Sequence, residues 1–525
     1  MDLLIDRWIP VRGDGGTGEF RLLTLEELLC AQGNWWVSLP RDDLELACIQ
    51  LLVCMAQVMF LPEKDAELRQ RLRDPLTPEG LADGIAPCRD WFDLDHPTQP
   101  FMQTREIQTE KITPIQKLLV GLPEGNNHAF FNQAGEVLRI GGPVAAIALF
   151  NLASNTPCYG TGFKGNLRGG SNPFLAPITS LVIGENLRDT VWRNVVTRSR
   201  LRDLLGRMPD ASSDKPTWLE AIHGSQQAAE IELARGLFWQ PARLELVPAG
   251  HGVRCDLLGG ENSAGYAGFR IERSLFKVES LWPHPHGVRM RVGGKDRFAS
   301  FSSEAPAWTQ LSEFLVPNPW DKDAKEGSVP AAPVNQAADI WPDRRSHLLV
   351  GGYCTRISSV IERRHDLFSL AEGWAKDRVF IKELVRVGKE SRSALRSALI
   401  VASKGYEDRK KNIKLKGIGT IHKKNKTLLG LHDVGDRLFY SRTEPLFHES
   451  LGKAQTFQDR QRAKATFCQS IVKAAQGVFE DLTSPYATMP ELIAVVAFAR
   501  SRLKGNLSKI TGGKANVQKR KRGNA

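Results

Sequence analysis

The chain has 525 residues, with 71 lysines and arginines against 59 aspartates and glutamates, which gives a formal net charge of +12. Hydrophobic residues make up 42% of the sequence and tryptophans number 12, so the composition excludes a wholly disordered chain and supplies cores for about three folding units. The excess of positive charge favours a polyanionic partner.

The first 120 residues are predicted to be mainly helical. Thr24-Leu25-Glu26-Glu27 has the spacing of a capping box and opens a short helix. The most apolar run, Leu44–Phe60, contains three polar or charged residues, which predicts a buried helix and not a membrane span. The acidic stretch Met1–Asp6 lacks the basic start of an export signal, and the eight cysteines form no CxxC pair. These features favour a cytoplasmic protein with reduced cysteines.

Residues 121–175 are rich in glycine and surround one apolar helical stretch, Val144–Leu152. Loops with this composition often carry contacts to the backbone of a ligand. Within them, Gly160-Thr161-Gly162-Phe163-Lys164-Gly165 matches GxGxxG, but no strand pattern precedes it and no acidic residue is placed to hold a ribose. A dinucleotide site is therefore disfavoured.

From Leu237 to Ser302 the hydrophobic period drops to two. Val288–Val292 and Arg297–Phe301 alternate on either side of Gly293-Gly294-Lys295-Asp296, which predicts a hairpin with one basic face. Just before it, Trp282–His286 contains two histidines that could hold a metal. No cysteine or carboxylate lies at a suitable spacing, so a structural turn is the better interpretation.

After Asp366 the pattern is helical to the end, in four segments at about 376–403, 433–452, 456–482 and 488–505, which predicts an antiparallel bundle. Residues 376–525 hold 32 lysines and arginines against 13 acidic residues. This charge suits sequence-independent contacts to phosphates, and a solvated helical surface with a disordered tail is the alternative. The candidates for contact with the phosphate backbone of a nucleic acid lie between the first two helices: Lys404, Arg409, Lys410, Lys411, Lys414 and Lys416.

No stretch of local sequence assembles a catalytic site. The phosphate-binding pattern GxxxxGK[ST] is absent, and Arg363-Arg364-His365-Asp366 has the residues of a kinase catalytic loop in the wrong order. The eight cysteines include no closely spaced set that could hold zinc. We therefore predict no catalytic residue, no cofactor and no metal.

Nine blocks of sequence are informative when they are taken together. They are Ser38-Leu-Pro-Arg-Asp-Asp-Leu-Glu-Leu-Ala47, Pro100-Phe-Met-Gln-Thr104, Ala129-Phe-Phe-Asn-Gln133, Ala146-Ile-Ala-Leu-Phe-Asn151, Gly165-Asn-Leu-Arg-Gly-Gly170, Arg235-Gly-Leu-Phe-Trp-Gln-Pro-Ala242, Leu281-Trp-Pro-His-Pro-His286, Ala305-Pro-Ala-Trp-Thr-Gln310 and Glu362-Arg-Arg-His-Asp366. In this order the chain resembles the CasA family, the large subunit of the type I-E CRISPR surveillance complex called Cascade.

The resemblance implies an α+β fold: a large mixed α/β N-terminal domain (residues 1–366), a C-terminal four-helix bundle (367–510), and a basic tail (511–525) that we expect to be disordered. It implies a non-catalytic subunit that recognises the protospacer-adjacent motif (PAM) in double-stranded DNA from the minor groove. The subunit would help to open the duplex, stabilise the R-loop and provide the docking site for a helicase–nuclease. Its other partners would be the CRISPR guide RNA, the displaced DNA strand and the remaining Cascade subunits, including the small subunits; no membrane is implied.

The family's guide-RNA loop places an aromatic residue and an asparagine on Phe130 and Asn132. An aromatic ring can stack on an unpaired base, and an amide can bond base edges or sugar hydroxyls. The alternative is that Phe130 belongs to the core and Asn132 to a turn.

Three further family elements read the PAM. The two key positions of a glycine loop fall on Cys158 and Thr161, with Gly160 and Gly162 adjacent, so the resemblance leaves the base preference of the loop open. A lysine finger has its counterpart in Arg273, with Arg270 nearby on the same strand pattern, and arginine brings a planar fork that suits a narrow groove.

The third element is a hairpin wedge that enters the base stack beside the PAM. Here it falls on Arg356, Ile357 and Ser358, and Ile357 takes the place of the family's glutamine. An apolar side chain is a suitable wedge because it needs no hydrogen bonds when it replaces stacking. The alternative is that Ile357 packs into the core.

Two other functions remain open at this point. One is a nuclease or another nucleic-acid-modifying enzyme with scattered catalytic residues. The other is the same subunit in a Cascade repurposed for a task such as guided transposition.

Overall fold

The computed structural model describes residues 1–120, 132–160, 163–169, 174–210, 214–221, 224–262, 264–274, 276–356, 359–410, 430–453, 456–490 and 492–512. By its internal contacts the chain divides into two compact units. The first comprises Met1–Ser303, Glu313–Pro342 and Ser346–Phe368. The second comprises Glu304–Ser312, Asp343–Arg345 and Ser369–Ala525, so two short segments join the C-terminal unit from earlier in the sequence.

The first unit begins with a small antiparallel sheet in which β1 (Ile9–Arg12) lies between β2 (Phe20–Leu23) and β3 (Trp36–Val37). The helices in this part of the chain are α1 (Leu25–Leu29), α2 (Asp42–Met59), α3 (Asp65–Arg73) and α4 (Pro78–Ile85). The capping box before α1 is confirmed, because the side chains of Thr24 and Glu27 each accept a hydrogen bond from the other's backbone N–H. The expectation of a mainly helical start was incomplete, since it missed this sheet.

The core of the first unit contains two packed helices, α2 and α5 (Gly142–Ser154). Every residue of α5 except Leu152 is buried, as are most residues of α2. A helix that is apolar around its whole circumference must be covered on all sides, which is why both lie inside the unit. The predicted buried helix over Leu44–Phe60 is confirmed.

A second sheet has β11 (Gly265–Arg273) at its centre. β11 pairs with β8 (Ala242–Gly250), β4 (Thr113–Pro114) and β5 (Ile140–Gly141), always antiparallel. A third sheet has the order β17-β16-β6, with β6 at Thr179–Ile183, β16 at Ser346–Arg356 and β17 at Ser359–Leu370. β17 continues to Leu370, past the residue at which the helical pattern was expected to begin.

A fourth sheet contains the predicted basic hairpin. β13 (Arg289–Val292) lies between β14 (Lys295–Phe298) and β15 (Glu326–Val329). Gly293 and Gly294 both have positive φ, +59° and +78°, the geometry of a two-residue hairpin turn. The second strand therefore begins at Lys295, two residues earlier than the sequence suggested.

The remaining elements are shorter or peripheral. The strands are β7 (Gly224–Gln227), which is parallel to β12 (Phe276–Glu279), and the pair β9 (Val253–Arg254) and β10 (Glu261–Asn262). The helices are α6 (Leu187–Asn194), α7 (Arg198–Leu205), α8 (Leu233–Leu237), α9 (Leu311–Leu315) and α10 (Ala332–Ile340). Short 3-10 helices lie at Asp14–Gly16, Ala86–Cys88, Ile115–Leu118, Ala228–Glu230, Ala307–Gln310 and Trp374–Lys376.

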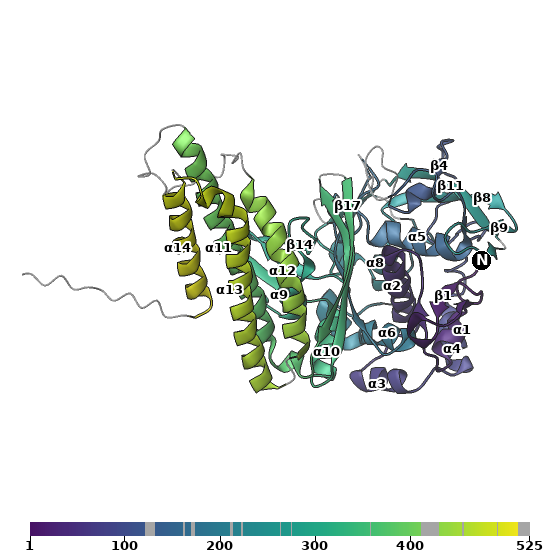
Figure 1. Ribbon diagram of the computed structural model, residues 1–525. Helices are drawn as coiled ribbons and strands as arrows, with labels where there is room; N and C mark the ends of the chain where they lie inside the picture. Colours follow the sequence, from purple (N-terminus) through teal and green to yellow (C-terminus); the bar gives the residue numbers. More distant parts are fainter. Residues whose placement is uncertain are drawn as a thin grey trace, which may run out of the picture. The chain divides into compact units, whose positions relative to one another are not determined.

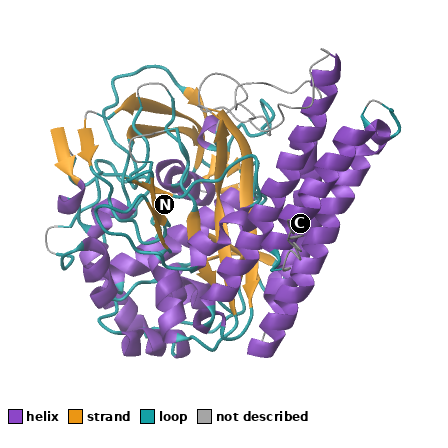
Figure 2. Ribbon diagram, turned by 90° about the vertical axis from the view of Figure 1, so that its left-hand side faces the viewer, coloured by secondary structure: helices purple, strands orange, loops and turns teal. Residues whose placement is uncertain are grey.

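The second unit is a bundle of long helices, α11 (Arg378–Lys410), α12 (Leu431–Lys453), α13 (Phe457–Ala487) and α14 (Ile493–Ile510). Figure 1 shows these helices side by side, and Figure 2 shows that the bundle is helical while the strands belong to the other unit. Trp308, from one of the earlier segments, stacks on Phe447 of α12 with 4.7 Å between ring centroids. The predicted fold class, a mixed α/β domain followed by a four-helix bundle, is confirmed.

α11 ends at Lys410 and not near residue 403, so Lys404, Arg409 and Lys410 stand on helical backbone. Lys411, Lys414 and Lys416 lie outside the described residues. None of the helices in the described part of the chain combines the length and apolar composition that a bilayer crossing requires.

Candidate nucleic-acid interface

Two of the predicted DNA-reading elements meet at the end of β11. Arg273 is exposed there, and its guanidinium carbon lies 5.9 Å from the centroid of the Phe163 ring. Phe163 belongs to the glycine-rich segment and makes an edge contact with Tyr159, which in turn contacts Phe269 of β11. These aromatic contacts fix the described part of the glycine-rich segment against the strand that carries Arg273. The sequence reasoning did not single out Phe163 or Tyr159.

Within this segment, Cys158 and Gly160 are buried. The thiol of Cys158 lies 3.6 Å from the carbonyl oxygen of Gly160 and donates to it, and burial raises the pKa of this thiol. Because Cys158 is buried as a whole residue, it offers no exposed group for contact with a ligand. Thr161 and Gly162, the other predicted members of the loop, lie outside the described residues.

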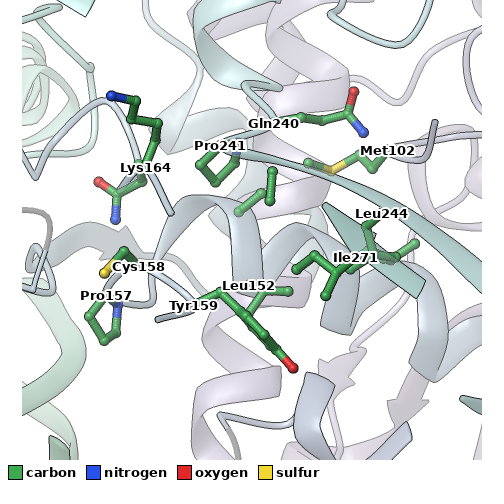
Figure 3. Close-up of a pocket in the computed structure, with 14 residues that line it drawn as sticks. Met102, Leu152, Pro157, Cys158, Tyr159, Lys164, Gln240, Pro241, Leu244 and Ile271 are labelled. Carbon is green, nitrogen blue, oxygen red and sulfur yellow. The ribbon is translucent and has the colours of Figure 1, made fainter. Parts of the chain in front are cut away.

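A small cavity lies beside the same segment (Figure 3). Its lining includes Cys158, Tyr159, Lys164, Gln240 and Ile271. The cavity holds about 30 Å³, which is room for one water molecule and far too little for a nucleobase. We therefore place no ligand in it.

Arg168 holds the base of the glycine-rich segment. Its side chain is buried and donates to Ser154 O at 2.6 Å, Asn155 Oδ1 at 2.8 Å and Thr179 Oγ1 at 2.9 Å. Asn166 also joins the two ends of this segment, because its Nδ2 donates to Thr156 O at 2.8 Å. Burial lowers the pKa of Arg168 to about 9, so the group is still charged at neutral pH. Nothing in the local sequence marked this arginine apart from its place within a run of glycines.

His284 and His286 are buried, and the backbone N–H of His286 donates to Nδ1 of His284 at 3.1 Å. Burial, followed by the nearby charge of Arg168, lowers the pKa of both, to about 3 for His286, so both are neutral at physiological pH. Among the described residues, no group of three or more His, Cys, Asp or Glu side chains is arranged to hold a metal ion. The geometry is that of a buried turn.

Arg270 and Arg273 are not brought together. Side chains alternate between the two faces of a strand, and the two residues are an odd number of positions apart. Arg270 lies 3.5 Å from Glu245, which Arg105 also contacts at 3.3 Å. A neighbouring pair, Arg243 and Glu272, lies on the same face. Arg270 thus belongs to a group of ion pairs on the face of β11 opposite Arg273. The prediction that placed Arg270 beside Arg273 in the minor-groove finger did not take strand alternation into account.

The β16–β17 hairpin places Arg356 at the end of β16, where the residue is exposed. Ile357 and Ser358, the two residues between the strands, lie outside the described part of the chain. β16 packs so closely against the segment at Pro177 that a Cβ at Gly352 would lie 2.9 Å from Pro177 O. Gly352 also has φ of +153°, which L side chains rarely adopt.

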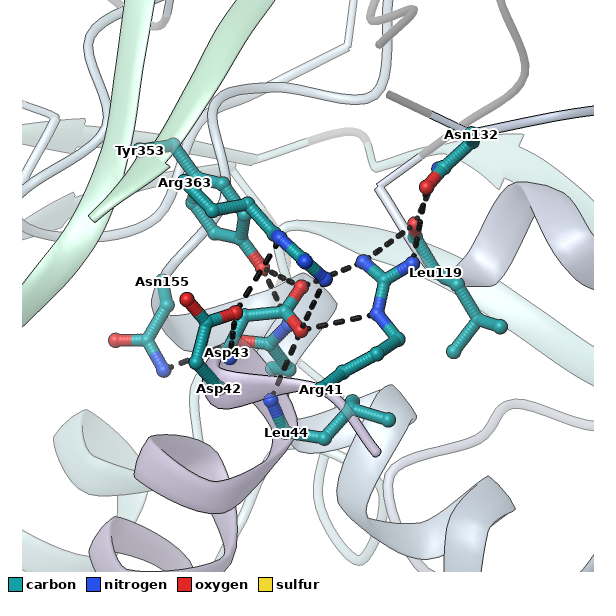
Figure 4. A network of polar contacts seen from close by, with 10 residues as sticks. Arg41, Asp42, Asp43, Leu44, Leu119, Asn132, Asn155, Tyr353 and Arg363 are labelled. Carbon is teal, nitrogen blue, oxygen red and sulfur yellow. Dashed lines mark hydrogen bonds and ion pairs between the residues drawn. The ribbon is translucent and has the colours of Figure 1, made fainter. Parts of the chain in front are cut away.

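Asn132 points into the protein. Its Oδ1 accepts from Arg41 Nη1 at 3.0 Å, and its Nδ2 donates to Leu119 O at 2.9 Å. The side chain is buried, so its described contacts are with the protein on both sides of the amide. Phe130 lies outside the described residues. Figure 4 shows the contact with Arg41 and the polar network beyond it.

The described part of the bundle carries many cations that are already paired. Examples are Arg392 and Arg396 with Asp436, Arg500 with Glu480, and Arg442 with Asp481. By contrast, residues 411–429 and 513–525 contain 11 lysines and arginines and no acidic residue. Of the surplus of 19 positive charges in residues 376–525, 11 thus belong to segments outside the described residues.

Comparison with known proteins adds an independent finding. Residues 2–477 match the family described as CRISPR-associated protein Cse1. The CRISPR-associated protein CasA/Cse1 of Thermus thermophilus is 24% identical over 398 residues, 71% of this chain and 71% of its own.

Solved structures agree with this match. The structure of Thermus thermophilus CasA (Cse1) superposes with a TM-score of 0.70 at 17% identity, covering 97% of this chain and 99% of its own. A chain of a CRISPR RNA-guided surveillance complex gives a TM-score of 0.63 at 15% identity, covering 96% and 99%. At these identities the superpositions establish a shared fold.

Proposed function

The chain belongs to the CRISPR-associated protein Cse1 family, and on that premise we propose that it is the non-catalytic large subunit of a type I-E CRISPR RNA-guided DNA surveillance complex. In this role it recognises the PAM in double-stranded DNA and helps to open the duplex. It also stabilises the R-loop and receives the helicase–nuclease that acts on the target. Guide pairing supplies the sequence specificity, and this chain checks the short motif beside it.

One observation carries the PAM-reading part of the proposal: Arg273 is exposed beside Phe163 of the glycine-rich segment. A cationic fork next to a segment rich in glycine suits a narrow groove, because the fork reaches acceptors on the base edges while the backbone can approach closely. The minor groove mainly distinguishes A·T from G·C pairs. Such a site therefore restricts the motif loosely and does not read a long sequence.

The proposed wedge is the connection between β16 and β17, with Arg356 exposed at its described edge. The hairpin consists of two long strands, and β16 packs closely against its neighbours at Gly352. Such a hairpin is a suitable support for a side chain that must enter the base stack. Ile357 would be that side chain, with Arg356 and Ser358 beside it. Phe130 and Asn132 would serve the guide RNA.

The basic residues in the last turns of α11 and in the segment after it would contact phosphates without reading sequence. Flexible lysines and arginines neutralise the backbone of either DNA strand equally well. The candidates remain Lys404, Arg409, Lys410, Lys411, Lys414 and Lys416. The bundle would contact the small subunits and the displaced strand, and the complex would assemble in the cytoplasm.

The test is a selection with the assembled complex. The complex is loaded with guide RNA and mixed with duplexes that carry a matching target next to a randomised PAM. We expect a restricted set of motifs for the unaltered chain, and about tenfold weaker duplex binding with a broadened set for Arg273→Ala or Ile357→Ala. Binding of single-stranded target should stay within about twofold.

Arg270→Ala is the matched control, because it removes an arginine from the same strand but from the opposite face. Glu245 keeps Arg105 as its partner in this variant, so little else should change. The proposal fails if the unaltered complex selects no motif. It also fails if Arg273→Ala weakens binding of duplex and single-stranded targets equally, or if Arg270→Ala has the same effect as Arg273→Ala.

A further inference from the structure

A buried carboxylate, Asp43 in the first turn of α2, joins parts of the chain that are far apart in sequence (Figure 4). Arg41 donates to both of its oxygens, from Nε to Oδ1 at 3.0 Å and from Nη2 to Oδ2 at 2.7 Å. The hydroxyl of Tyr353 donates to Oδ2 at 2.7 Å. Because the side chain of Asp43 is only 4% exposed, these donors replace the water that the charge would otherwise need.

The first arm of this network reaches the guide-RNA segment. Arg41 donates from Nη1 to Asn132 Oδ1 at 3.0 Å and from Nη2 to Leu119 O at 3.1 Å, and Asn132 donates to the same carbonyl. Leu119 and Asn132, which we call the neck, lie on either side of residues 121–131. One guanidinium group therefore holds both sides of the neck and Asp43 at once.

The second arm reaches the β16–β17 hairpin from both strands. Tyr353 lies on β16, three residues before Arg356, and directly follows the glycine at which that strand approaches Pro177. Arg363 lies on β17 and contacts Asp42 at 3.2 Å and Asp43 at 3.5 Å. Asp43 thus ties each strand of the hairpin to the start of α2.

The third arm reaches the glycine-rich segment through α5. Asn151 donates from Nδ2 to the hydroxyl of Tyr353 at 2.7 Å, and Asn155 donates to Asn151 Oδ1 at 3.3 Å. Arg168 then donates to Asn155 Oδ1 at 2.8 Å. All members of this chain of contacts are buried, with exposed fractions of 1 to 3%.

We propose that these residues, which we call the Asp43 network, form one positioning unit that sets the guide-RNA neck, the β16–β17 hairpin and the glycine-rich segment relative to one another. The proposal rests on the function proposed above, because it concerns the elements to which that function assigns RNA and DNA contacts. Asp43 and Tyr353 are positioning residues: they touch no nucleic acid, and they act through the neck and the hairpin. The network comprises Arg41, Asp43, Asn132, Asn151, Asn155, Arg168, Tyr353 and Arg363.

The charge state of the network supports a rigid unit. Burial alone would raise the pKa of Asp43, but the charge and hydrogen bonds of Arg41, with Arg363 and Tyr353, outweigh it and the pKa is lowered. Burial and the charge of Asp43 raise the pKa of Tyr353, so its hydroxyl stays protonated and remains a donor. A buried network whose donors and acceptors are matched in this way has one preferred arrangement.

Tyr353→Phe is the central variant, since it removes one oxygen atom and leaves the ring in place. It takes a donor from Asp43 and an acceptor from Asn151. In the complex with guide RNA, we expect binding of a duplex target with its preferred PAM to weaken about tenfold. Binding of a single-stranded target, which needs no opening, should change by less than about twofold.

Tyr266→Phe is the matched control. The hydroxyl of Tyr266 donates to Asp95 at 2.6 Å, so this variant also removes a bond between a buried tyrosine and an aspartate, outside the Asp43 network. Tyr266→Phe should lose less thermal stability than Tyr353→Phe, because Asp95 is 42% exposed and can bind water in its place. Only Tyr353→Phe should change the ratio of duplex to single-strand binding. Arg363→Gln, at a partly exposed residue, should shift this ratio in the same direction by a smaller factor.

The outcomes separate the two proposals. If the unaltered complex shows no preference for any PAM, the proposed function fails and this inference fails with it. If it shows a preference, but Tyr353→Phe and Tyr266→Phe give the same ratio, or Tyr353→Phe weakens both targets equally, the positioning role is overturned and the proposed function stands. The role is supported when Tyr353→Phe and Arg363→Gln change the ratio and Tyr266→Phe does not.

Discussion

Arg168 donates a 2.8 Å hydrogen bond to Asn155 in the interior of the first unit, and no carboxylate of the described residues forms an ion pair with it. Its charge is offset instead by carbonyl, amide and hydroxyl oxygens. A planar guanidinium can serve such divergent acceptors at once, whereas an ammonium group cannot. The site therefore requires arginine for its shape as well as for its charge.

Arg168→Lys should lower the free energy of unfolding of the first unit by about 2–4 kcal/mol, because buried acceptors lose their donors while the charge remains. The measurement is chemical denaturation followed by tryptophan fluorescence. Arg270→Lys, on a partly exposed ion pair, should cost less than about 1 kcal/mol. Equal losses in the two variants would show that the buried acceptors do not depend on the fork.

Asp214 should make stability depend on pH. Burial raises its pKa to about 6, against the opposing hydrogen bonds from the backbone N–H groups of Ala234 and Arg235. Asp214 thus has a higher pKa in the folded state than in the unfolded state, so its protonated form favours folding. The stability that Asp214 contributes is fully present below pH about 4 and is lost as pH rises through about 6. Relative to Asp214→Asn, the wild-type chain should lose about 1 kcal/mol of unfolding free energy between pH 5 and pH 7.5. A constant difference across this range in urea titrations would contradict the assignment.

The bundle contains a buried carboxylate held by two arginines. Asp436 accepts from Arg392 Nε at 2.9 Å and Nη2 at 2.7 Å, and also pairs with Arg396. Asp436→Ala should destabilise the bundle by about 2 kcal/mol, since it removes a buried carboxylate that two partly buried arginines share, although Arg396 keeps Asp433 as a partner. Asp481→Ala breaks an exposed pair with Arg442 in the same bundle and should cost less than about 1 kcal/mol. Denaturation of both variants with guanidinium chloride measures the two losses of unfolding free energy. Equal losses would show that Asp436 contributes no more than an exposed carboxylate.

The basic segment after α11 should control the salt dependence of DNA binding. If Lys411, Lys414 and Lys416 each neutralise one phosphate, replacing all three by alanine lowers the slope of log K against log salt by about 2.7. The set of PAMs selected should not change, because phosphate contacts carry no sequence information. The control replaces three arginines that the bundle's carboxylates already hold: Arg386, Arg442 and Arg500. A change of slope in the control as large as in the lysine variant would locate the DNA path elsewhere.

Helices were the most predictable part of the fold. α2 and α5 stand out as apolar runs that must be buried on all sides, and the bundle helices stand out by their length. The strands β1, β2 and β3 were missed because they have only four, four and two residues, too few for an alternating pattern to stand out. The helical pattern was expected to begin after Asp366, whereas β17 continues to Leu370. The charged run Glu362–Asp366 forms ion pairs within the strand and with α2, so it does not mark the end of the sheet.

The candidate interface was predictable only in part. Strand alternation could have separated Arg270 from Arg273, and the proline-arginine-aspartate order before Leu44 could have indicated a charged helix start. The contact between Asp43 and Tyr353 could not be predicted, since 310 positions separate the two residues and only the tertiary fold joins them. A buried arginine among glycines, Arg168, gives no local signal either, because its partners come from α5 and β6.

The neck has a consequence for protein engineering. Leu119 and Asn132 are joined by hydrogen bonds from Arg41 to both and from Asn132 to the Leu119 carbonyl oxygen, so the residues on either side of the stretch 121–131 are fixed to one another. A chimera that takes residues 121–131 from another family member and keeps both anchor residues would leave these hydrogen bonds in place. Under the function proposed above, such an exchange would alter the stretch assigned to the guide RNA and leave the residues assigned to the motif unchanged.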